Sequence, residues 1–478
     1  MTDRMWSRRL LLKSGTASLV VVLRRGGSAT AQEAAQPSDA VLAGLIEAAA
    51  EPLGEIADPD FARFIDRYAE AKVVLLGEAS HGTDEFYRAR TAFTERLVRE
   101  HGFTVVAVEA DWPDAARIDA HIRGLEALPS PNAPFPRFPA WMWRNRAIED
   151  FMTRLRAYNE EAQDPARQVG FYGLDLYSLP SSMDAVEEFA RRHDPAALDE
   201  IRARYGCLAP HAEDPQSYGA VTCGPAADSC AADVTSVIDE VLGARLGEVG
   251  VSNRAFSDAV MNARVVAASE AYYRAMYEGS VASWNLRDTH MFETLKRVLE
   301  ARGDGAKAVI WAHNGHIGDA RATGMGAMGE VNLGQLAREE WGEGAVLIGF
   351  GTDRGTVTAA TAWNGAPETL DVNTSLPGSW GALMREAGPD RFLLDLRKVQ
   401  GPLAEALAAE RIERYIGVLY MRQTELPSHY VASAIGQEYD AYIWLEETRA
   451  VEPVPLEEIK GCRRSIRSRS SALQPNSA

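Results

Sequence analysis

Short runs of apolar residues recur along this chain of 478 residues, and they constrain its fold more than any other feature. Few of the runs alternate with polar residues. Strands that helices cover on both faces are apolar along their whole length, whereas strands with one wet face alternate. We therefore expect an α/β fold with a mainly parallel sheet flanked by helices. The expected strands are 72–76, 104–108, 169–172, 308–311, 346–350, 392–396, 416–420 and 441–445.

Helical signals separate the first strands. Apolar residues recur at helical spacing from Phe86 to Leu97, and Gly102 stands where a helix would end. After the second strand, Asp111 predicts an N-cap, and Pro113 suits the first turn of the next helix. These patterns predict βαβ units.

The stretch 182–302 differs from the rest of the chain. It is rich in Ala, Glu and Arg, it contains helical patterns at 256–277 and 289–299, and it has no convincing strand. We interpret it as a helical insertion that forms a lid or wall beside a discontinuous catalytic core of 32–181 and 303–455.

The first residues have the pattern of an export signal. Arg8 and Arg9 precede an apolar stretch at 14–23, and the small residues 29–31 offer a cleavage site before Gln32. An amphipathic first helix is the alternative, but two arginines directly after the apolar stretch argue against it. We therefore expect residues 1–31 to be a twin-arginine signal peptide, the export machinery to be a partner, and the protein to be periplasmic or secreted.

Composition limits the partners. The formal net charge is −18, which argues against binding to nucleic acid or to anionic membranes. We find no apolar run near the roughly 20 residues that span a bilayer. A basic segment at 456–478 is expected to be a disordered tail.

The cysteines fit an oxidising compartment. Cys207, Cys223 and Cys230 lie close together, and a disulfide among them is plausible. A zinc site is less so, because no C-x-x-C spacing occurs.

Ionisable residues follow the predicted strands. Ligands of parallel sheets bind beyond the carboxyl ends of the strands, so residues there are expected to meet. Each one alone can be a helix cap or a satisfied core residue, but ionisable groups are costly to bury unless they are paired. The residues are Glu78 and His81 after the first strand, Glu109 after the second, Asp175 and Tyr177 after the third, and His313 and His316 after the fourth.

The residue types in this set limit its chemistry. No serine stands in G-x-S-x-G, no cysteine follows these strands, and no glycine pattern for phosphate or dinucleotide binding occurs. What remains is a histidine that acts as general base on water, or two histidines and a glutamate that hold a catalytic metal. Arg90, near the inward face of its helix, needs an acidic partner, either Glu78 or Glu109.

These motifs resemble the erythromycin esterase family, and the resemblance extends over about 42–455. It also includes segments at 141–145, 173–178, 318–323, 332–336 and 428–430. The motifs that carry it are Gly77-Glu78-Ala79-Ser80-His81, Arg90, Glu109 and Trp311-Ala312-His313-Asn314-Gly315-His316.

The resemblance implies metal-independent hydrolysis of a small-molecule ester or lactone, with no cofactor. It implies that His81 activates water, that Glu78 and Glu109 orient and polarise it, and that Arg90, His313 and His316 shape the site and stabilise charge. The segments at 141–145 and 428–430 look like the branch labelled with succinoglycan biosynthesis, so macrolides are one candidate substrate among many. The candidate substrate-binding residues are Trp143, Asp175, Tyr177 and His429.

Two other functions stay open from the sequence. One is a metal-dependent hydrolase that uses His81, Glu109 and either His313 or His316. The other is a non-catalytic periplasmic protein of binding or polysaccharide assembly that reuses the fold.

Overall fold

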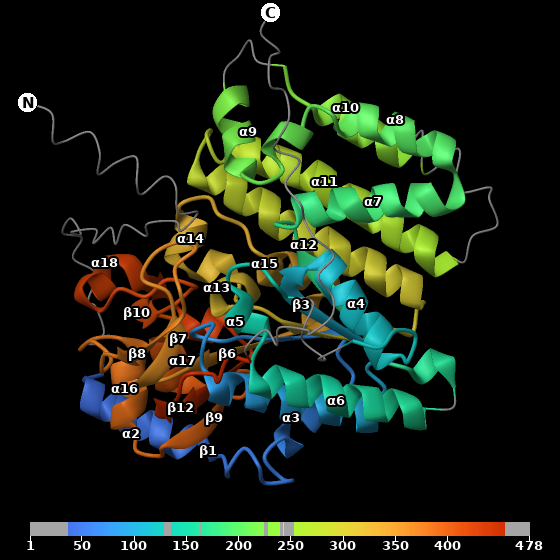
Figure 1. Cartoon of the computed structure of the whole chain (residues 1–478). Helices are drawn as coiled ribbons and strands as arrows, with labels where there is room; N and C mark the ends of the chain where they lie inside the picture. Colours follow the sequence, from blue (N-terminus) through green and yellow to red (C-terminus); the bar gives the residue numbers. More distant parts are fainter. Residues whose placement is uncertain are drawn as a thin grey trace, which may run out of the picture.

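A mainly parallel sheet runs through the centre of the protein (Figure 1). The computed structural model describes residues 37–128, 135–162, 164–223, 228–239, 242 and 253–454. Within them the sheet has the strand order β1-β9-β12-β6-β2-β5-β3-β4. In it β9 runs antiparallel to both of its neighbours, β1 and β12, and all other neighbouring strands are parallel. The α/β prediction is confirmed. The strands are β1 (Glu51–Pro52), β2 (Val73–Leu76), β3 (Val105–Asp111), β4 (Gly170–Asp175), β5 (Ala308–Trp311), β6 (Ala345–Gly351), β9 (Arg391–Asp395) and β12 (Ala441–Leu445).

One predicted strand is wrong. The run 416–420 makes only isolated bridges, from Ile416 to Ser80 and from Leu419 to Ala360. Ile416 and Tyr420 are apolar because they pack with Val357 in a small separate core, not because they belong to the sheet. Two small sheets outside the central one have more polar strands. They consist of β7 (Arg354–Ala359), β8 (Glu368–Val372) and β13 (Glu447–Thr448), and of β10 (Arg411–Arg414) and β11 (Tyr430–Ser433).

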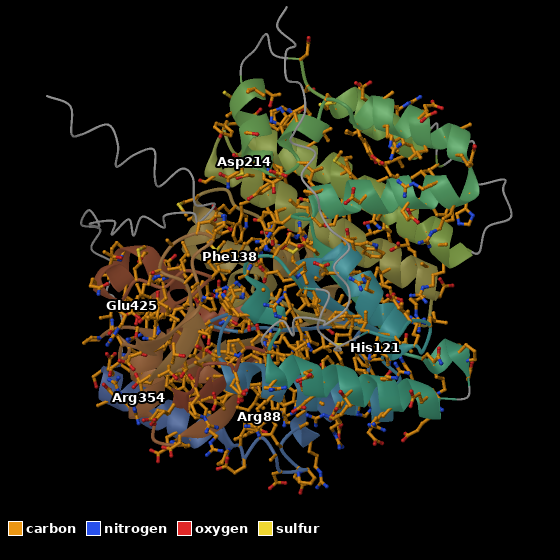
Figure 2. All side chains as sticks on the ribbon, in the orientation of Figure 1. Arg88, His121, Phe138, Asp214, Arg354 and Glu425 are labelled. Atoms are coloured by element: carbon orange, nitrogen blue, oxygen red, sulfur yellow. A yellow bond between two sulfur atoms is a disulfide. The ribbon has the colours of Figure 1, made fainter. Side chains whose placement is uncertain are left out.

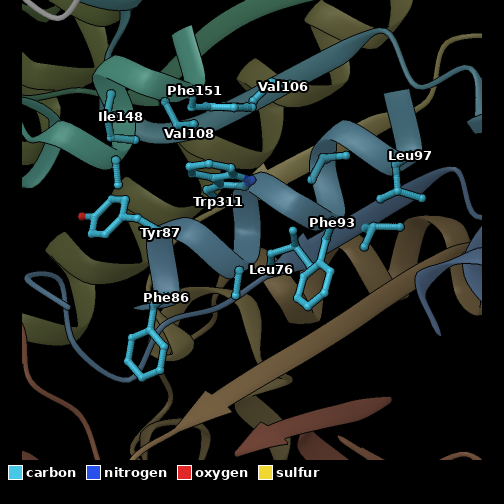
Figure 3. Packing of buried hydrophobic residues seen from close by; sticks show 14 of the residues in the cluster. Leu76, Phe86, Tyr87, Phe93, Leu97, Val106, Val108, Ile148, Phe151 and Trp311 are labelled. Atoms are coloured by element: carbon cyan, nitrogen blue, oxygen red, sulfur yellow. The ribbon is translucent and has the colours of Figure 1, made fainter. Parts of the chain in front are cut away.

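Helices α3 (Asp84–His101) and α6 (Arg146–Glu161) cover one face of the sheet. Figure 3 shows Phe86 and Phe93 of α3 and Phe151 of α6 within this core, and the Phe151 ring stacks on Trp311 of β5 with centroids 4.7 Å apart. Helix α3 ends as predicted, because Gly102 adopts a left-handed φ of 71° that favours glycine. Helix α4 (Trp112–Ile122) follows β3 and packs on β4.

Other helices cover the opposite face of the sheet, where alternate residues of the same strands form a second core. The described helices that contribute to it include α2 (Asp39–Ala49), α12 (Ser280–Arg302), α15 (Leu333–Trp341), α16 (Trp380–Glu386), α17 (Gly401–Leu407) and α19 (Ile435–Glu438). Sheet residues are therefore buried on both sides, which explains why their sequence runs are continuously apolar.

The stretch that was interpreted as an insertion contains helices joined by turns and has no strand among its described residues, and it lies above the sheet in Figure 1. Asp214, labelled in Figure 2, belongs to this part, whereas Arg88 of α3 lies at the other side of the molecule. A third apolar core holds these helices together, and a Cys207–Cys230 disulfide adds to it, while Cys223 is free and exposed. In this part of the chain, the described α-helices that precede α12 are α7 (Leu179–His193), α8 (Pro195–Tyr205), α9 (Pro215–Thr222), α10 (Ala231–Ser236) and α11 (Asn253–Ala275).

Short helices connect the remaining elements, and none of the described helices is long and apolar enough to cross a membrane. The predicted signal peptide at 1–31 and the predicted tail at 456–478 lie outside the described residues. The short helices are α5 (Ala140–Trp143), α13 (Asn314–Ile317), α14 (Gly324–Ala327) and α18 (Glu425–His429).

Candidate active site

Three neighbouring strands bring the residues of the site to one level. Leu76 of β2 and Val108 of β3 both lie opposite Trp311 of β5, so the residues that come next in each strand begin at the same edge. The turn after β2 begins with Gly77, where a Cβ atom would lie 2.1 Å from the Asn314 side chain. Asn314, which follows β5, uses that side chain to bind the backbone of Phe350 on β6. Only glycine at position 77 leaves room for the Asn314 side chain at the end of β2.

His81 is paired with Glu78, and Glu78 is held by Arg90. Nδ1 of His81 lies 2.9 Å from Oε1 of Glu78, and Nη2 of Arg90 donates to Oε2 of the same carboxylate at 2.6 Å. Arg90 is fully buried between the rings of Tyr87 and Trp311, at 4.5 and 4.9 Å from their centroids. The acidic partner of Arg90 is thus Glu78 and not Glu109, the other carboxylate that the sequence left open.

One nitrogen of His81 is left for chemistry. Glu78 accepts a hydrogen bond from Nδ1 of His81, which leaves the lone pair on Nε2, and Nε2 makes no hydrogen bond with any residue that the structure describes. This is the arrangement that a general base needs, because the carboxylate fixes the tautomer and stabilises the ring when it becomes protonated.

Glu109 of β3 is bound on both oxygens. Oε2 accepts the backbone N–H of His313 at 2.9 Å, while Oε1 accepts from Nη2 of Arg287 at 2.7 Å and lies 3.3 Å from Nε2 of His316. Burial alone would raise the pKa of Glu109, but the positive charges of His316 and Arg287 outweigh burial and hold it well below its usual value. Glu109 is therefore an anion that orders the residues around it.

Arg287 joins two of the predicted carboxylates. Its Nε and Nη2 atoms donate to the two oxygens of Asp175, at 2.9 and 2.6 Å, and the guanidinium lies 5.0 Å from the centroid of the Tyr177 ring. The helix α12 supplies Arg287, so the helical part of the chain completes the site. Arg287 was not predicted from the sequence as a site residue. A pattern that indicates its burial is present, because Arg287 and Asp288 share a helical face with the apolar Met291 and Leu295.

His316 lies between α12 and the sheet. Both oxygens of Asp288 lie within 3.0 Å of its Nδ1, and the Trp284 ring stacks on it with centroids 4.5 Å apart and planes 4° apart. Nη1 of Arg287 lies 2.8 Å from Nε2, a hydrogen bond that needs the neutral ring. Burial also favours the neutral ring, but Asp288 and Glu109 raise the pKa of His316 to about 9. The cluster holds three carboxylates, Glu109, Asp175 and Asp288, but one guanidinium, that of Arg287. A second positive charge on His316 is therefore favoured, and we take the imidazolium as the state at neutral pH.

This pKa predicts how stability depends on pH. His316 binds its proton more tightly in the folded protein than at its usual pKa of 6.5, so its contribution is complete below pH 6.5 and is lost as the pH rises through about 9. We expect the free energy of unfolding to fall by up to about 3 kcal/mol across that window. Asp288→Asn should move the loss to lower pH, as urea denaturation at pH 6, 7.5 and 9.5 can measure. Parallel curves for both proteins would contradict the assignment.

His313 faces His81. Their ring centroids are 4.9 Å apart, and Tyr415 packs edge-on against the other side of His313 at 5.3 Å. Nδ1 of His313 accepts the backbone N–H of Gly315, which places the ring proton on Nε2. Burial and the neighbouring His81 hold the pKa of His313 well below its usual value, so the ring is neutral. Its Nε2 is buried with no hydrogen-bond partner of good geometry among the described residues, although a backbone contact with Ala79 also acts on the ring, and a substrate oxygen can accept the Nε2 proton.

Two candidate substrate-binding residues make contacts of a different kind. Trp143 is buried against Tyr87, and its indole N–H donates to the backbone oxygen of Glu109 at 3.1 Å, so it supports β3. Nε2 of His429 accepts from the backbone N–H of Met421 at 3.2 Å, and its ring packs on Tyr420. No contact joins the His429 side chain to the cluster around His81 within the part of the chain that the structure describes.

The arrangement brings an imidazole that can act as a base, an uncharged N–H donor and positive charge to one edge of the sheet. His81 has an Nε2 atom without a hydrogen-bond partner among the described residues, His313 has an uncharged N–H, and His316 and Arg287 have positive charge that Glu109 binds. Within the described residues no group of three His, Cys, Asp or Glu side chains has the arrangement of a metal site. The geometry suits attack of water on a carbonyl carbon with stabilisation of the oxyanion.

Known proteins resemble this chain in sequence. A family model described as erythromycin esterase matches residues 98–448. An erythromycin esterase type II from Escherichia coli is 27% identical over 136 residues, which is 28% of this chain and only 31% of that relative.

Solved structures share the fold. A protein from Bacillus cereus superimposes with a TM-score of 0.75 and 20% identity, over 88% of this chain and 100% of the other. A structure titled as a succinoglycan biosynthesis protein gives a TM-score of 0.71 and 21% identity, over 87% and 99%. A histidine-to-asparagine mutant of the erythromycin esterase EreC in its open conformation gives 0.59 and 15%, over 82% and 95%.

Proposed function

Because this chain belongs to the erythromycin esterase family, whose membership supports a hydrolase, we propose that it cleaves a carboxylic ester or lactone with water activated by His81. The observation that carries the proposal is the buried series Arg90–Glu78–His81, which leaves Nε2 of His81 without a hydrogen-bond partner among the described residues, with the His313 ring 4.9 Å from the His81 ring. This chain matches only about a third of the length of the curated relative, so we infer the substrate class from the chemistry of the site and not from that relative.

The proposed reaction has two steps. Nε2 of His81 takes a proton from water while the oxygen of that water attacks the ester carbon, and Glu78 stabilises the imidazolium that forms. The carbonyl electrons move to the oxygen, where the Nε2–H of His313 and the positive charge of His316 stabilise the oxyanion. The oxyanion then collapses, the bond to the alcohol oxygen breaks, and the proton on His81 passes to the leaving alkoxide.

The contacts of the two glutamates support water rather than a carboxylate as the nucleophile. Both oxygens of Glu78 are engaged, by His81 and Arg90, and both oxygens of Glu109 are engaged, by His313 and by Arg287. A carboxylate that attacked the ester would have to give up one of these buried hydrogen bonds.

Isotope labelling tests the proposal. In a single turnover in H₂¹⁸O with enzyme in excess, we expect one ¹⁸O atom in the carboxylic acid product, as measured by mass spectrometry, and the same labelling after dialysis against a chelator. A first turnover that yields unlabelled acid would mean that a side-chain carboxylate attacks. Activity that is lost on chelation and restored by a metal ion would mean that a metal activates the water.

The substrate range and the location are further parts of the proposal. We propose a small-molecule ester or lactone, with macrolides as one candidate, and export through the twin-arginine machinery to the periplasm or beyond. The export signal is a pattern of residues 1–31 alone. Mass spectrometry of the protein recovered from the periplasm should find Gln32 at the N-terminus, and a retained Met1 would contradict export with cleavage.

A further inference from the structure

Glu330 is a buried carboxyl group that the proposed mechanism does not use. It lies in the loop between α14 and α15, only 2% of its surface is exposed, and its Oε2 atom is enclosed without a hydrogen-bond partner among the described residues. Buried carboxyl groups are normally paired, because an unpaired one lowers the stability of the protein. An unpaired one beside an active site therefore suggests a partner that arrives with the substrate.

The loop that carries Glu330 is fixed to α12. Asn285 accepts the backbone N–H of Val331 at 2.7 Å and donates to the backbone oxygen of Gly329 at 3.0 Å, so it binds both neighbours of Glu330. Asp288, which binds His316, also accepts the backbone N–H of Leu333 at 2.9 Å. The position of Glu330 is therefore tied to the same helix that positions His316.

A hydrogen-bond donor without a partner lies on the same helix. Trp284 precedes Asn285, its ring stacks on His316, and its indole Nε1 is enclosed without a hydrogen-bond partner within the described part of the chain. Glu330 lies near the same histidine, because Asn285 holds Gly329 and Val331 on either side of it, and Asp288, which binds Nδ1 of His316, holds the backbone of Leu333. In keeping with this position, burial and the charge of Asp288 raise the pKa of Glu330 to about 7, while the charge of His316 lowers it. His316 therefore has an unsatisfied donor and an unsatisfied acceptor in its surroundings.

Only some ligand groups can satisfy both. An ammonium group donates but does not accept, and a carbonyl or ether oxygen accepts but does not donate. A carboxylate would be repelled by Asp288 and by ionised Glu330. An amide donates and accepts through two different atoms, whereas a hydroxyl group does both through one oxygen, and neighbouring hydroxyls of a polyol can reach the two atoms separately. We infer that Trp284 and Glu330 form a subsite for a hydroxyl-bearing part of the substrate, such as a sugar or polyol, next to His316.

This inference rests on the proposed function, because it assigns a substrate class to the same site. It is tested with three butyrate-type esters: butyl butyrate, glyceryl 1-monobutyrate with hydroxyls on the alcohol, and butyl 3-hydroxybutyrate with a hydroxyl on the acid. We expect Glu330→Leu to lower the ratio of kcat/KM for a hydroxylated ester to that for butyl butyrate by about tenfold or more. Trp284→Phe keeps the ring but removes the donor, and it should lower the same ratio. Glu330→Gln, which keeps one acceptor, should recover part of it.

A matched control and a binding measurement keep the inference separable from catalysis. Glu343→Leu changes an exposed glutamate near the end of α15, and its ratio should equal that of the wild type. Saturation-transfer NMR with methyl β-glucoside should show binding to the wild type and none to Glu330→Leu, whether or not the esters turn over. An unchanged ratio for both hydroxylated esters in Glu330→Leu, or equal binding of the glucoside to both proteins, would overturn the subsite. Normal glucoside binding without turnover of any ester would instead overturn the proposed function.

Discussion

Replacing His81 with alanine is expected to lower kcat by roughly 10²- to 10⁴-fold while KM changes little. The reason is that we propose Nε2 of His81 as the proton acceptor for water, and no other described imidazole nitrogen near it offers a free lone pair, since Nε2 of His313 carries the ring proton. Nδ1 of His313 accepts from the backbone of Gly315, and Nδ1 of His316 is bound to Asp288. The measurement is steady-state hydrolysis on a panel of macrolides, lactones, aryl esters and acylated sugars.

The control for this experiment is His193→Ala on α7, where the ring packs against Phe189 and not against the strand ends. Both variants should retain the far-ultraviolet circular dichroism of the wild type. Activity of His81→Ala within tenfold of the wild type on every substrate that the wild type cleaves would contradict the role of His81 as base. Glu78→Gln should give a smaller loss, because the amide still orients the ring but no longer stabilises its charge.

Replacing Arg287 with methionine is expected to destabilise the protein by about 3–5 kcal/mol and to abolish activity. The guanidinium binds Glu109 and Asp175 together, and both carboxylates are buried. Without it, two buried negative charges lose their partner, and Glu109 no longer holds His316 and the backbone of His313 in place. The measurement is the free energy of unfolding from urea denaturation at neutral pH.

A second substitution separates loss of charge from loss of packing. Arg287→Met combined with Asp175→Asn removes one of the unpaired carboxylates, so the double variant should regain part of the lost stability. Arg63→Met is the control, because Arg63 is exposed and its described ion pair is with the exposed Asp60 at 2.8 Å, and it should cost less than about 1 kcal/mol. Arg287→Met with the stability of the wild type would mean that Arg287 does not hold these carboxylates.

The part of the candidate site that could be predicted from the sequence consists of side chains that come directly after a predicted strand. Glu78, Glu109, Asp175 and His313 were found because each follows an apolar run, and neighbouring parallel strands end at the same edge. The run at 416–420 misled the same argument, because a short apolar segment has no periodicity that separates a strand from a loop packed in a small core.

What the sequence by itself determined is the layered fold, the family and the residues at the ends of the strands, because local apolar patterns and short motifs encode them. Only the tertiary structure decided the partners of those residues. It paired Arg90 with Glu78, it brought Arg287 and Asp288 from α12 to Glu109 and His316, and it placed Glu330 beside them. The physical reason is that the pairing of charges depends on distances across the fold, between residues as far apart in sequence as Glu109 and Arg287, and no local pattern records such distances.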